Sequence, residues 1–119
     1  MGGESPLKVY GGDCTRSFCF IDDVLNSINI LRENPETNGG IYNVGNDDEE
    51  IMISELAKIV INTSGYGYDL DVRDAPAGSV KRRCPDVSKI KKLGYKKTVP
   101  LKEGIQKTFD WYRTELTNS

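Results

Sequence analysis

The residues best suited to bind a charged ligand are three arginines. Arg16 stands alone among small polar residues after a glycine turn, and Arg82 and Arg83 are adjacent. Guanidinium groups donate paired hydrogen bonds to phosphate oxygens, and two cationic contacts offset the hydration that a diphosphate loses when it binds. These arginines predict a phosphate-class anion site. The alternative for Arg16 is a surface ion pair with Asp13.

Other site chemistries are excluded by the composition. The chain has 119 residues, no histidine, and three cysteines without a Cys-x-x-Cys pair. Zinc sites, Ser-His or Cys-His nucleophiles and histidine bases are therefore excluded, and the odd number of cysteines argues against a disulfide framework. We expect no metal site and a reduced, cytoplasmic protein whose cysteines are small core or loop residues, namely Cys14, Cys19 and Cys84.

Two acidic clusters have simpler interpretations than catalysis or metal binding. Asp22 and Asp23 stand at an expected helix start, where carboxylates cap backbone N–H groups and interact favourably with the helix dipole. The run Asp47–Glu50 has the charge for calcium but lacks the glycine and glutamate spacing of a calcium loop. We expect a helix cap at the first cluster and a solvated turn at the second.

Charge is distributed unevenly along the sequence. The formal net charge is −2, but residues 1–80 hold 5 Lys/Arg against 14 Asp/Glu, whereas residues 81–102 hold 9 Lys/Arg against Asp86 alone. A concentrated basic segment is typical of a polyanion-binding surface. Because Tyr95 is the single aromatic residue within it and the whole chain is acidic, nucleic-acid binding is a second alternative, and lysines on a solvated helix face are favoured.

Length and composition favour one domain over residues 1–119. Hydrophobic residues make up 37% and charged residues 29%, which is ordinary for a folded domain. No apolar run approaches the length of a membrane span, and the start MGGESPLK lacks the apolar segment of a secretory signal. The sequence predicts a cytoplasmic protein without membrane contact.

Alternating strand and helix patterns predict an α/β fold in the order ββαβαβαα. Strands are expected at residues 6–10, 41–44 and 69–73, with a further strand or extended segment at 17–21. Helices are expected after a cap at Asp22 or Asp23, after the turn at residues 45–48 with Gly65 at the helix end, after a cap at Asp86, and after Pro100. Residues 74–85 form a loop. The expected buried faces are Val24, Leu25, Ile28 and Leu31; Ile53, Leu56, Ala57 and Val60; Val87, Ile90 and Leu93; and Leu101, Ile105, Phe109, Tyr112 and Leu116.

Several short phrases occur in a fixed order along the chain. They are PLKVYG, TRSFCFIDDV, IYNVGN, ELA, RCPDVSK, LGY, PLKEGI and TFDW. Together they resemble the C-terminal part of the extended short-chain dehydrogenase/reductase family, the NAD-dependent nucleotide-sugar epimerases, dehydratases and decarboxylases. The resemblance covers nearly the whole chain. It implies a small mixed α/β substrate-binding domain that lacks the N-terminal Rossmann half.

The resemblance also implies a binding role for five residues. The chain would hold the nucleotide diphosphate of a UDP-, dTDP- or GDP-sugar, with Val9 and Tyr10 along the base. Arg16 matches the diphosphate arginine of the family, and Arg82 or Arg83 would bring a second guanidinium to the phosphates. The alternative for Tyr10 is an aromatic side chain that closes the core at the end of a strand.

The catalytic features of the family are missing from these 119 residues. In the family, the Rossmann half binds NAD through a glycine-rich loop, and a Tyr-x-x-x-Lys motif supplies the catalytic base. Here no tyrosine is followed by lysine four residues later, and no glycine-rich loop joins a strand to a helix. We therefore expect no catalytic or cofactor-binding residues, NAD only in the complete family enzyme, and no activity of the chain alone.

A stand-alone module that holds nucleotide sugars or a protein partner without turnover is the alternative function. An enzyme half is expected to expose apolar surface, which would favour a Rossmann-domain partner or self-association. A stand-alone module is expected to be monodisperse and to unfold cooperatively.

Overall fold

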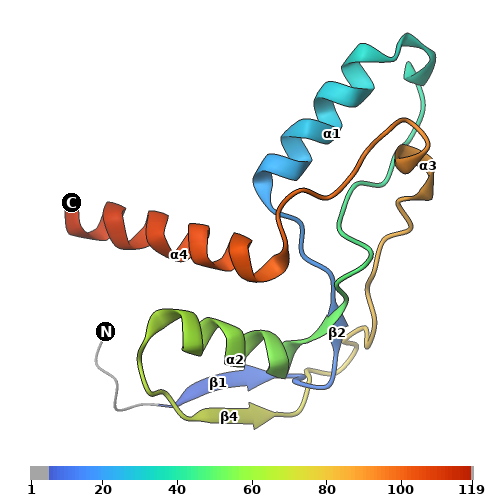
Figure 1. Cartoon of the computed structure of the whole chain (residues 1–119). Helices are drawn as coiled ribbons and strands as arrows, with labels where there is room; N and C mark the ends of the chain where they lie inside the picture. Colours follow the sequence, from blue (N-terminus) through green and yellow to red (C-terminus); the bar gives the residue numbers. More distant parts are fainter. Residues whose placement is uncertain (1–5, 119) are drawn as a thin grey trace.

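The computed structural model describes residues 6–118 and contains short strands and helices (Figure 1). The prediction of a mixed α/β fold is confirmed. In chain order the elements are β1 (Leu7–Tyr10), β2 (Thr15–Arg16), α1 (Ile21–Glu33), η1 (Pro35–Thr37), β3 (Ile51–Met52), α2 (Ile53–Ser64), β4 (Leu70–Arg73), α3 (Ser88–Lys91) and α4 (Leu101–Asn118).

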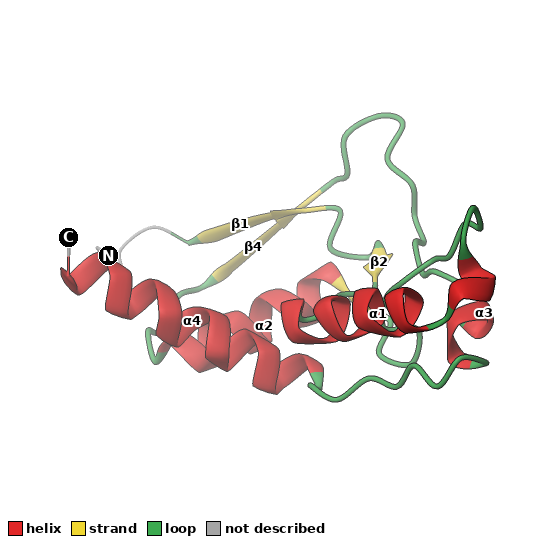
Figure 2. Ribbon diagram, turned by 90° about the horizontal axis from the view of Figure 1, so that it is seen from above, coloured by secondary structure: helices red, strands yellow, loops and turns green. Residues whose placement is uncertain are grey.

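Two small sheets organise the chain. β1 and β4 pair in parallel, with Val9 opposite Val72, and β2 pairs with β3 antiparallel. α2 lies over the β1–β4 sheet, and α4 packs on α2, so this end of the molecule has three layers (Figures 1 and 2). The predicted strands at residues 6–10 and 69–73 are confirmed. Gly65, in the left-handed conformation at φ 76°, ends α2 as its pattern predicted.

A second packing centre lies at the opposite end, around α1 and α3 (Figure 2). Val87, Ile90 and Tyr95 are buried there. The N-cap of α3 is Val87 and not the predicted Asp86, although the Asp86 carboxylate accepts a hydrogen bond from the Ser88 N–H at 2.9 Å. The Tyr95 hydroxyl donates to the Gly45 carbonyl at 2.8 Å. Burial raises the pKa of this phenol, with the nearby Cys19 thiol as the next cause. Partly buried apolar residues surround this centre, namely Ile30, Leu31, Tyr42 and Val44.

The strand predicted at residues 41–44 is wrong, because this segment is irregular. Of the two alternatives for residues 17–21, the strand is not formed: residues 17–20 are without regular structure, with Phe20 in an extended conformation, and Ile21 begins α1. The second sheet is instead built from Thr15–Arg16 and Ile51–Met52. A strand needs a neighbouring backbone to form its ladder. The Ile41 carbonyl accepts a hydrogen bond from the Lys89 side chain at 2.7 Å, so a lysine occupies the place of a ladder partner.

The predicted capping role of Asp22 and Asp23 is also wrong. Phe20 is the N-cap of α1 and makes no side-chain capping bond, while Asp23 is fully buried. Its carboxylate accepts hydrogen bonds from the Thr98 N–H at 2.9 Å, the Thr98 hydroxyl at 2.6 Å and the Val99 N–H at 3.1 Å. Burial raises the pKa of Asp23, but these hydrogen bonds outweigh it, and the net pKa is below the ordinary value.

The apolar faces predicted for α1 and α4 are only partly covered. Leu25 and Ile28 of α1 are half exposed, as is Tyr112 in the second half of α4, and Leu116 is largely exposed. By contrast, Ile30 and Leu31 of α1 contact the Tyr95 centre. No helix within residues 6–118 combines the length and apolar character needed to cross a membrane.

Candidate functional site

Arg16 lies on β2, and a tight turn carries the chain there from β1. Gly11 adopts φ 68°, a conformation that favours glycine, and its carbonyl accepts a hydrogen bond from the Cys14 N–H at 2.9 Å. An Arg16 Nη atom donates to its neighbour's carbonyl, Thr15 O, at 2.7 Å. Asp13 pairs with Lys81 at 3.2 Å. Within residues 6–118, no carboxylate pairs with the Arg16 guanidinium, so the alternative of an ion pair with Asp13 is wrong.

The backbone brings the second arginine group beside Arg16. Thr15 and Arg82 form an isolated parallel bridge, in which the Thr15 N–H donates to Lys81 O at 2.7 Å and the Arg83 N–H donates to Thr15 O at 3.2 Å. The bridge therefore brings the backbone of Thr15–Arg16 next to that of Arg82–Arg83, although the two segments are far apart in sequence. The sequence patterns identified the arginines, but they contained no signal that Thr15 would join them.

Arg82 and Arg83 are adjacent, but they differ in whether a carboxylate pairs with the guanidinium. The Arg82 Nε donates to both carboxylate oxygens of Glu50, at 2.9 and 2.8 Å, and this hydrogen bond lowers the pKa of Glu50 and raises that of Arg82. The Thr15 hydroxyl also donates to Glu50. The Arg83 side chain is exposed, and no acidic group of the described chain pairs with it. Arg83 is thus available to an anion, whereas Arg82 would first have to leave Glu50.

Val9 and Tyr10 lie on β1, ahead of the turn that leads to Arg16. Val9 is buried, and the Tyr10 side chain is 55% exposed. The alternative that Tyr10 closes the core is therefore wrong. Within residues 6–118, β1 pairs with β4 alone, so backbone groups on its other edge are open to a ligand.

The acidic run Asp47–Glu50 is a centre of ion pairs, which corrects the prediction of a solvated turn. Asp47 pairs with Lys91 at 2.7 Å, Asp48 with Lys97 at 2.9 Å, and Glu49 with Lys97 at 2.8 Å. The basic segment 81–102 therefore faces acidic residues of the same chain, which weakens the polyanion alternative. In the described residues, no cluster of cysteine and acidic side chains is arranged to hold a metal ion.

Glu49 has a structural role within this run. Its carboxylate accepts a hydrogen bond from the Leu101 N–H at 3.1 Å, the first residue of α4, and another from the Asn46 side chain at 3.0 Å. Burial raises the pKa of Glu49, but hydrogen bonds from Lys97, Asn46 and Leu101 outweigh it, so the net pKa is lowered. A carboxylate at a helix N-terminus satisfies free N–H groups and interacts favourably with the helix dipole.

Residues 6–118 do not form a dinucleotide cradle. Such a cradle needs a glycine-rich turn that leads from a strand directly into a helix. In this part of the chain, the strand that leads directly into a helix is β3, and its junction with α2 at Met52–Ile53 contains no glycine. These residues do not fit NAD.

The sequence and the fold relate the chain to one family of nucleotide-sugar enzymes. It is related to the epimerases, dehydratases and decarboxylases of the NAD-dependent epimerase/dehydratase family, within the extended short-chain dehydrogenases/reductases, and it matches the C-terminal part of their members. No family model matches the sequence.

Particular relatives show how far the match extends. The chain is 33% identical to UDP-glucuronic acid decarboxylase 1 of Xenopus tropicalis, over 98% of this chain and 27% of the relative. UDP-glucuronic acid 4-epimerase of Bacillus cereus, solved with UDP-glucuronic acid and NAD, superposes with a TM-score of 0.80 at 27% identity, over 92% of this chain and 35% of that one. UDP-glucose 4-epimerase of Thermotoga maritima, solved with UDP-glucose, superposes with a TM-score of 0.83 at 25% identity, over 96% and 36%. The chain therefore spans about a quarter to a third of the length of these relatives.

Proposed function

We propose that this chain binds the nucleotide diphosphate of a nucleotide sugar as the substrate-binding part of an NAD-dependent epimerase, dehydratase or decarboxylase. One observation supports this most strongly. Arg16 and Arg83, two guanidiniums without a carboxylate partner in the described chain, are carried on adjacent backbone segments joined through Thr15. Paired guanidiniums on neighbouring segments suit the two phosphates of a diphosphate. Arg82 would contribute by exchanging Glu50 for a phosphate oxygen.

The base would lie along β1. The N–H groups of Leu7 and Gly11 bond the β4 side, so the backbone of Val9, midway between them, also faces β4. The backbone groups of Lys8 and Tyr10 face the unpaired edge and can exchange hydrogen bonds with a base edge, and the exposed Tyr10 ring offers a stacking surface. The names of the relatives favour a UDP-sugar, because UDP-glucuronic acid and UDP-glucose were bound to the solved structures. NAD would belong to the complete enzyme and would contact residues outside the described part of this chain.

Calorimetric titration with UDP tests the binding proposal. Removing one charge-assisted hydrogen-bond donor costs about 1.5–3 kcal/mol, so Arg16→Ala and Arg83→Ala should each weaken UDP binding about 10- to 100-fold. Arg32→Ala is the matched control, because Arg32 is an exposed arginine at the far end of α1. Unchanged UDP affinity in both site variants would contradict the proposal.

We further expect the 119-residue chain to be catalytically inactive by itself. It contains no Tyr-x-x-x-Lys motif, so the family's catalytic base is missing from these residues. Incubation with NAD and either UDP-glucose or UDP-glucuronic acid, followed by chromatography of the nucleotide sugars, should show unchanged substrate. Formation of an epimerised or decarboxylated product above a no-protein control would overturn this expectation.

A further inference from the structure

The ion pair between Arg82 and Glu50 joins two side chains that are held very differently. The Glu50 side chain is 22% exposed, and the Thr15 hydroxyl donates to its carboxylate at 2.5 Å, a contact that does not depend on Arg82. The Arg82 side chain is 73% exposed, and within residues 6–118 it pairs with no carboxylate other than Glu50. The carboxylate is therefore the fixed member of the pair, and the guanidinium is the member that can move away.

The contact between the two side chains is weaker than an arginine can make. Both hydrogen bonds, at 2.9 and 2.8 Å, start from the one Nε–H group of Arg82, whereas a bidentate arginine uses two parallel N–H groups. Water also solvates an exposed ion pair, which reduces its contribution to stability. A diphosphate carries more charge than a carboxylate and accepts paired N–H groups, so it can replace Glu50 as the partner of Arg82.

Glu50 lies at the point where the other two arginines are brought together. It directly precedes β3, whose first residue, Ile51, pairs with Arg16. Thr15 connects Glu50 to the second segment, because its hydroxyl donates to Glu50 and its carbonyl accepts the Arg83 N–H. The negative charge of Glu50 is therefore placed beside the backbone that carries both unpaired guanidiniums, where it opposes a bound phosphate.

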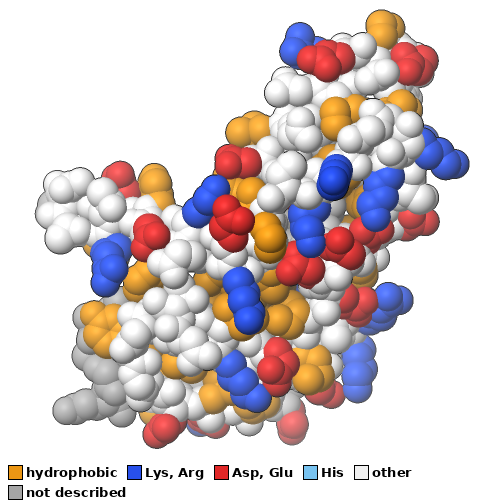
Figure 3. Space-filling view, viewed as in Figure 1, with side chains coloured by type: hydrophobic (Ala, Val, Ile, Leu, Met, Phe, Trp, Pro, Cys, Tyr) orange, Lys and Arg blue, Asp and Glu red, His pale blue; other side chains and the backbone are white. Residues whose placement is uncertain are grey.

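The lysines near this site do not replace Arg82. Figure 3 shows acidic and basic side chains interspersed over one face of the molecule, without a large patch of one sign. Lys81, for example, pairs with Asp13 at 3.2 Å. A lysine is also a point charge without the planar fork that matches a phosphate. Arg82 is the guanidinium directly beside Arg83, so its pairing with Glu50 decides how many guanidiniums a diphosphate meets.

We propose that Glu50 is an internal competitor of the nucleotide diphosphate, which holds Arg82 when no ligand is bound and gives it up to the phosphates when the ligand binds. The inference rests on the proposed function, because it concerns the same diphosphate site. Arg16 and Arg83 make the first contacts, and the exchange at Arg82 adds a third. Since Arg82 must leave Glu50 for this contact, Glu50 lowers the affinity of the site and favours release of the nucleotide.

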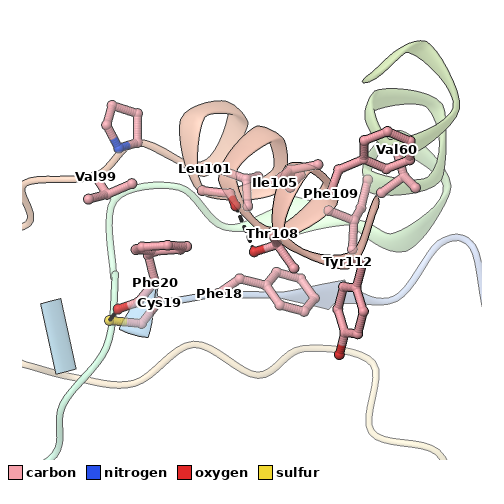
Figure 4. A pocket seen from close by; sticks show the side chains of 13 residues that line it. Phe18, Cys19, Phe20, Val60, Val99, Leu101, Ile105, Thr108, Phe109 and Tyr112 are labelled. Carbon is pink, nitrogen blue, oxygen red and sulfur yellow. Dashed lines mark hydrogen bonds between the residues drawn. The ribbon is translucent and has the colours of Figure 1, made fainter. Parts of the chain in front are cut away.

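UDP is a suitable probe because the large apolar groove offers it no cation. This groove encloses about 450 Å³ between α2, α4 and residues 18–20, and the residues that line it are uncharged (Figure 4). Its Thr108 hydroxyl donates to the Gly104 carbonyl at 2.8 Å. A diphosphate would lose its hydration there without compensation, so UDP affinity reports on the arginine site.

Side-chain NMR of the isotope-labelled chain tests the exchange. The Arg82 Nε–H signal, assigned as the one missing from Arg82→Lys, should shift with UDP, because its acceptor changes from a carboxylate to a phosphate oxygen. If the backbone amides of Arg16 and Arg83 shift and this signal does not, UDP binds while Arg82 stays with Glu50. That result would overturn this inference and leave the proposed function standing. No response from any of these signals would overturn both.

Calorimetric titration of Glu50→Gln with UDP measures the competition. Glutamine can still accept the Thr15 hydroxyl but holds Arg82 without charge, so UDP should bind about 2- to 5-fold more tightly. Glu103→Gln is the matched control, because Glu103 is an exposed glutamate that pairs with Lys107 on α4 and its replacement changes the net charge equally. The control should bind UDP like the wild type. Unchanged or weaker binding by Glu50→Gln would overturn the inference, and weaker binding would show that Glu50 positions the segment of Arg83.

Discussion

Asp23→Ala should lower the free energy of unfolding by about 3–5 kcal/mol, the largest effect on stability that we predict. Asp23 is fully buried, and its carboxylate is the acceptor for three donors of Thr98 and Val99. Alanine would leave those donors without an acceptor and would release α1 from the segment that leads into α4. Total stability is of the order of 5–15 kcal/mol for a domain, so much of the population would unfold.

Urea denaturation followed by circular dichroism measures this loss. Asp22→Ala is the matched control, because Asp22 is the preceding residue in the same first turn of α1 but is exposed. Its removal should cost less than about 1 kcal/mol, the value of a carboxylate near a helix N-terminus. Equal losses in the two variants would contradict the assigned role of Asp23.

The lowered pKa of Asp23 also predicts how stability depends on pH. A carboxyl group with a lower pKa in the folded state than in the unfolded chain stabilises the fold when it is ionised. This contribution is complete above the unfolded pKa near 3.8 and is lost as the pH falls through the lower, folded pKa. Wild-type stability should therefore fall below about pH 4, with a shallower dependence in Asp23→Asn. A wild type and an Asp23→Asn variant with parallel pH profiles would contradict this assignment.

Glu49→Ala is expected to cost about 1.5–3 kcal/mol and to loosen the start of α4. The carboxylate bonds the Leu101 N–H, the Asn46 amide and Lys97, so one side chain fixes the acidic run against the helix. The loss should be smaller than for Asp23→Ala, because Glu49 is partly exposed and water can reach the released groups. Amide hydrogen exchange should show faster exchange in the first turn of α4.

Asp48→Ala provides the matched control for Glu49. Asp48 is the adjacent acidic residue and also pairs with Lys97, but its side chain is 61% exposed, so the substitution should cost about 0.5 kcal/mol or less. Exchange in α4 should stay at the wild-type rate. If Asp48→Ala and Glu49→Ala changed α4 exchange equally, Lys97 rather than Glu49 would be the group that holds the helix.

Local signals in the sequence predicted much of the fold. The alternation around Val9 and Val72 identified β1 and β4, and the glycine at position 65 marked the end of α2. Asp86 was predicted as the cap of α3; the N-cap is the next residue, Val87, but the Asp86 carboxylate does accept the Ser88 N–H. In each case the deciding interaction lies within a few residues of the pattern, which is why the sequence alone reveals it.

The errors all concern interactions between residues far apart in sequence. The pair Asp22–Asp23 has the local signature of a cap, but Asp23 bonds residues 75 and 76 positions away. Ile41–Val44 has strand composition but no neighbouring backbone to form a ladder. For the candidate site, the sequence identified Arg16, Arg82 and Arg83, but neither the bridge through Thr15 nor the pairing of Glu50 with Arg82 has a local signal.

The most direct test of the central claim is a UDP titration of the isotope-labelled chain followed by backbone amide NMR. We predict that UDP shifts the amide signals of Val9, Tyr10, Arg16 and the Arg82–Arg83 segment only. NAD should shift none of them under the same conditions. This pattern would show that this part of the protein holds a nucleotide diphosphate site without the family's catalytic motif. A well-dispersed spectrum that UDP leaves unchanged at these amides would contradict the account.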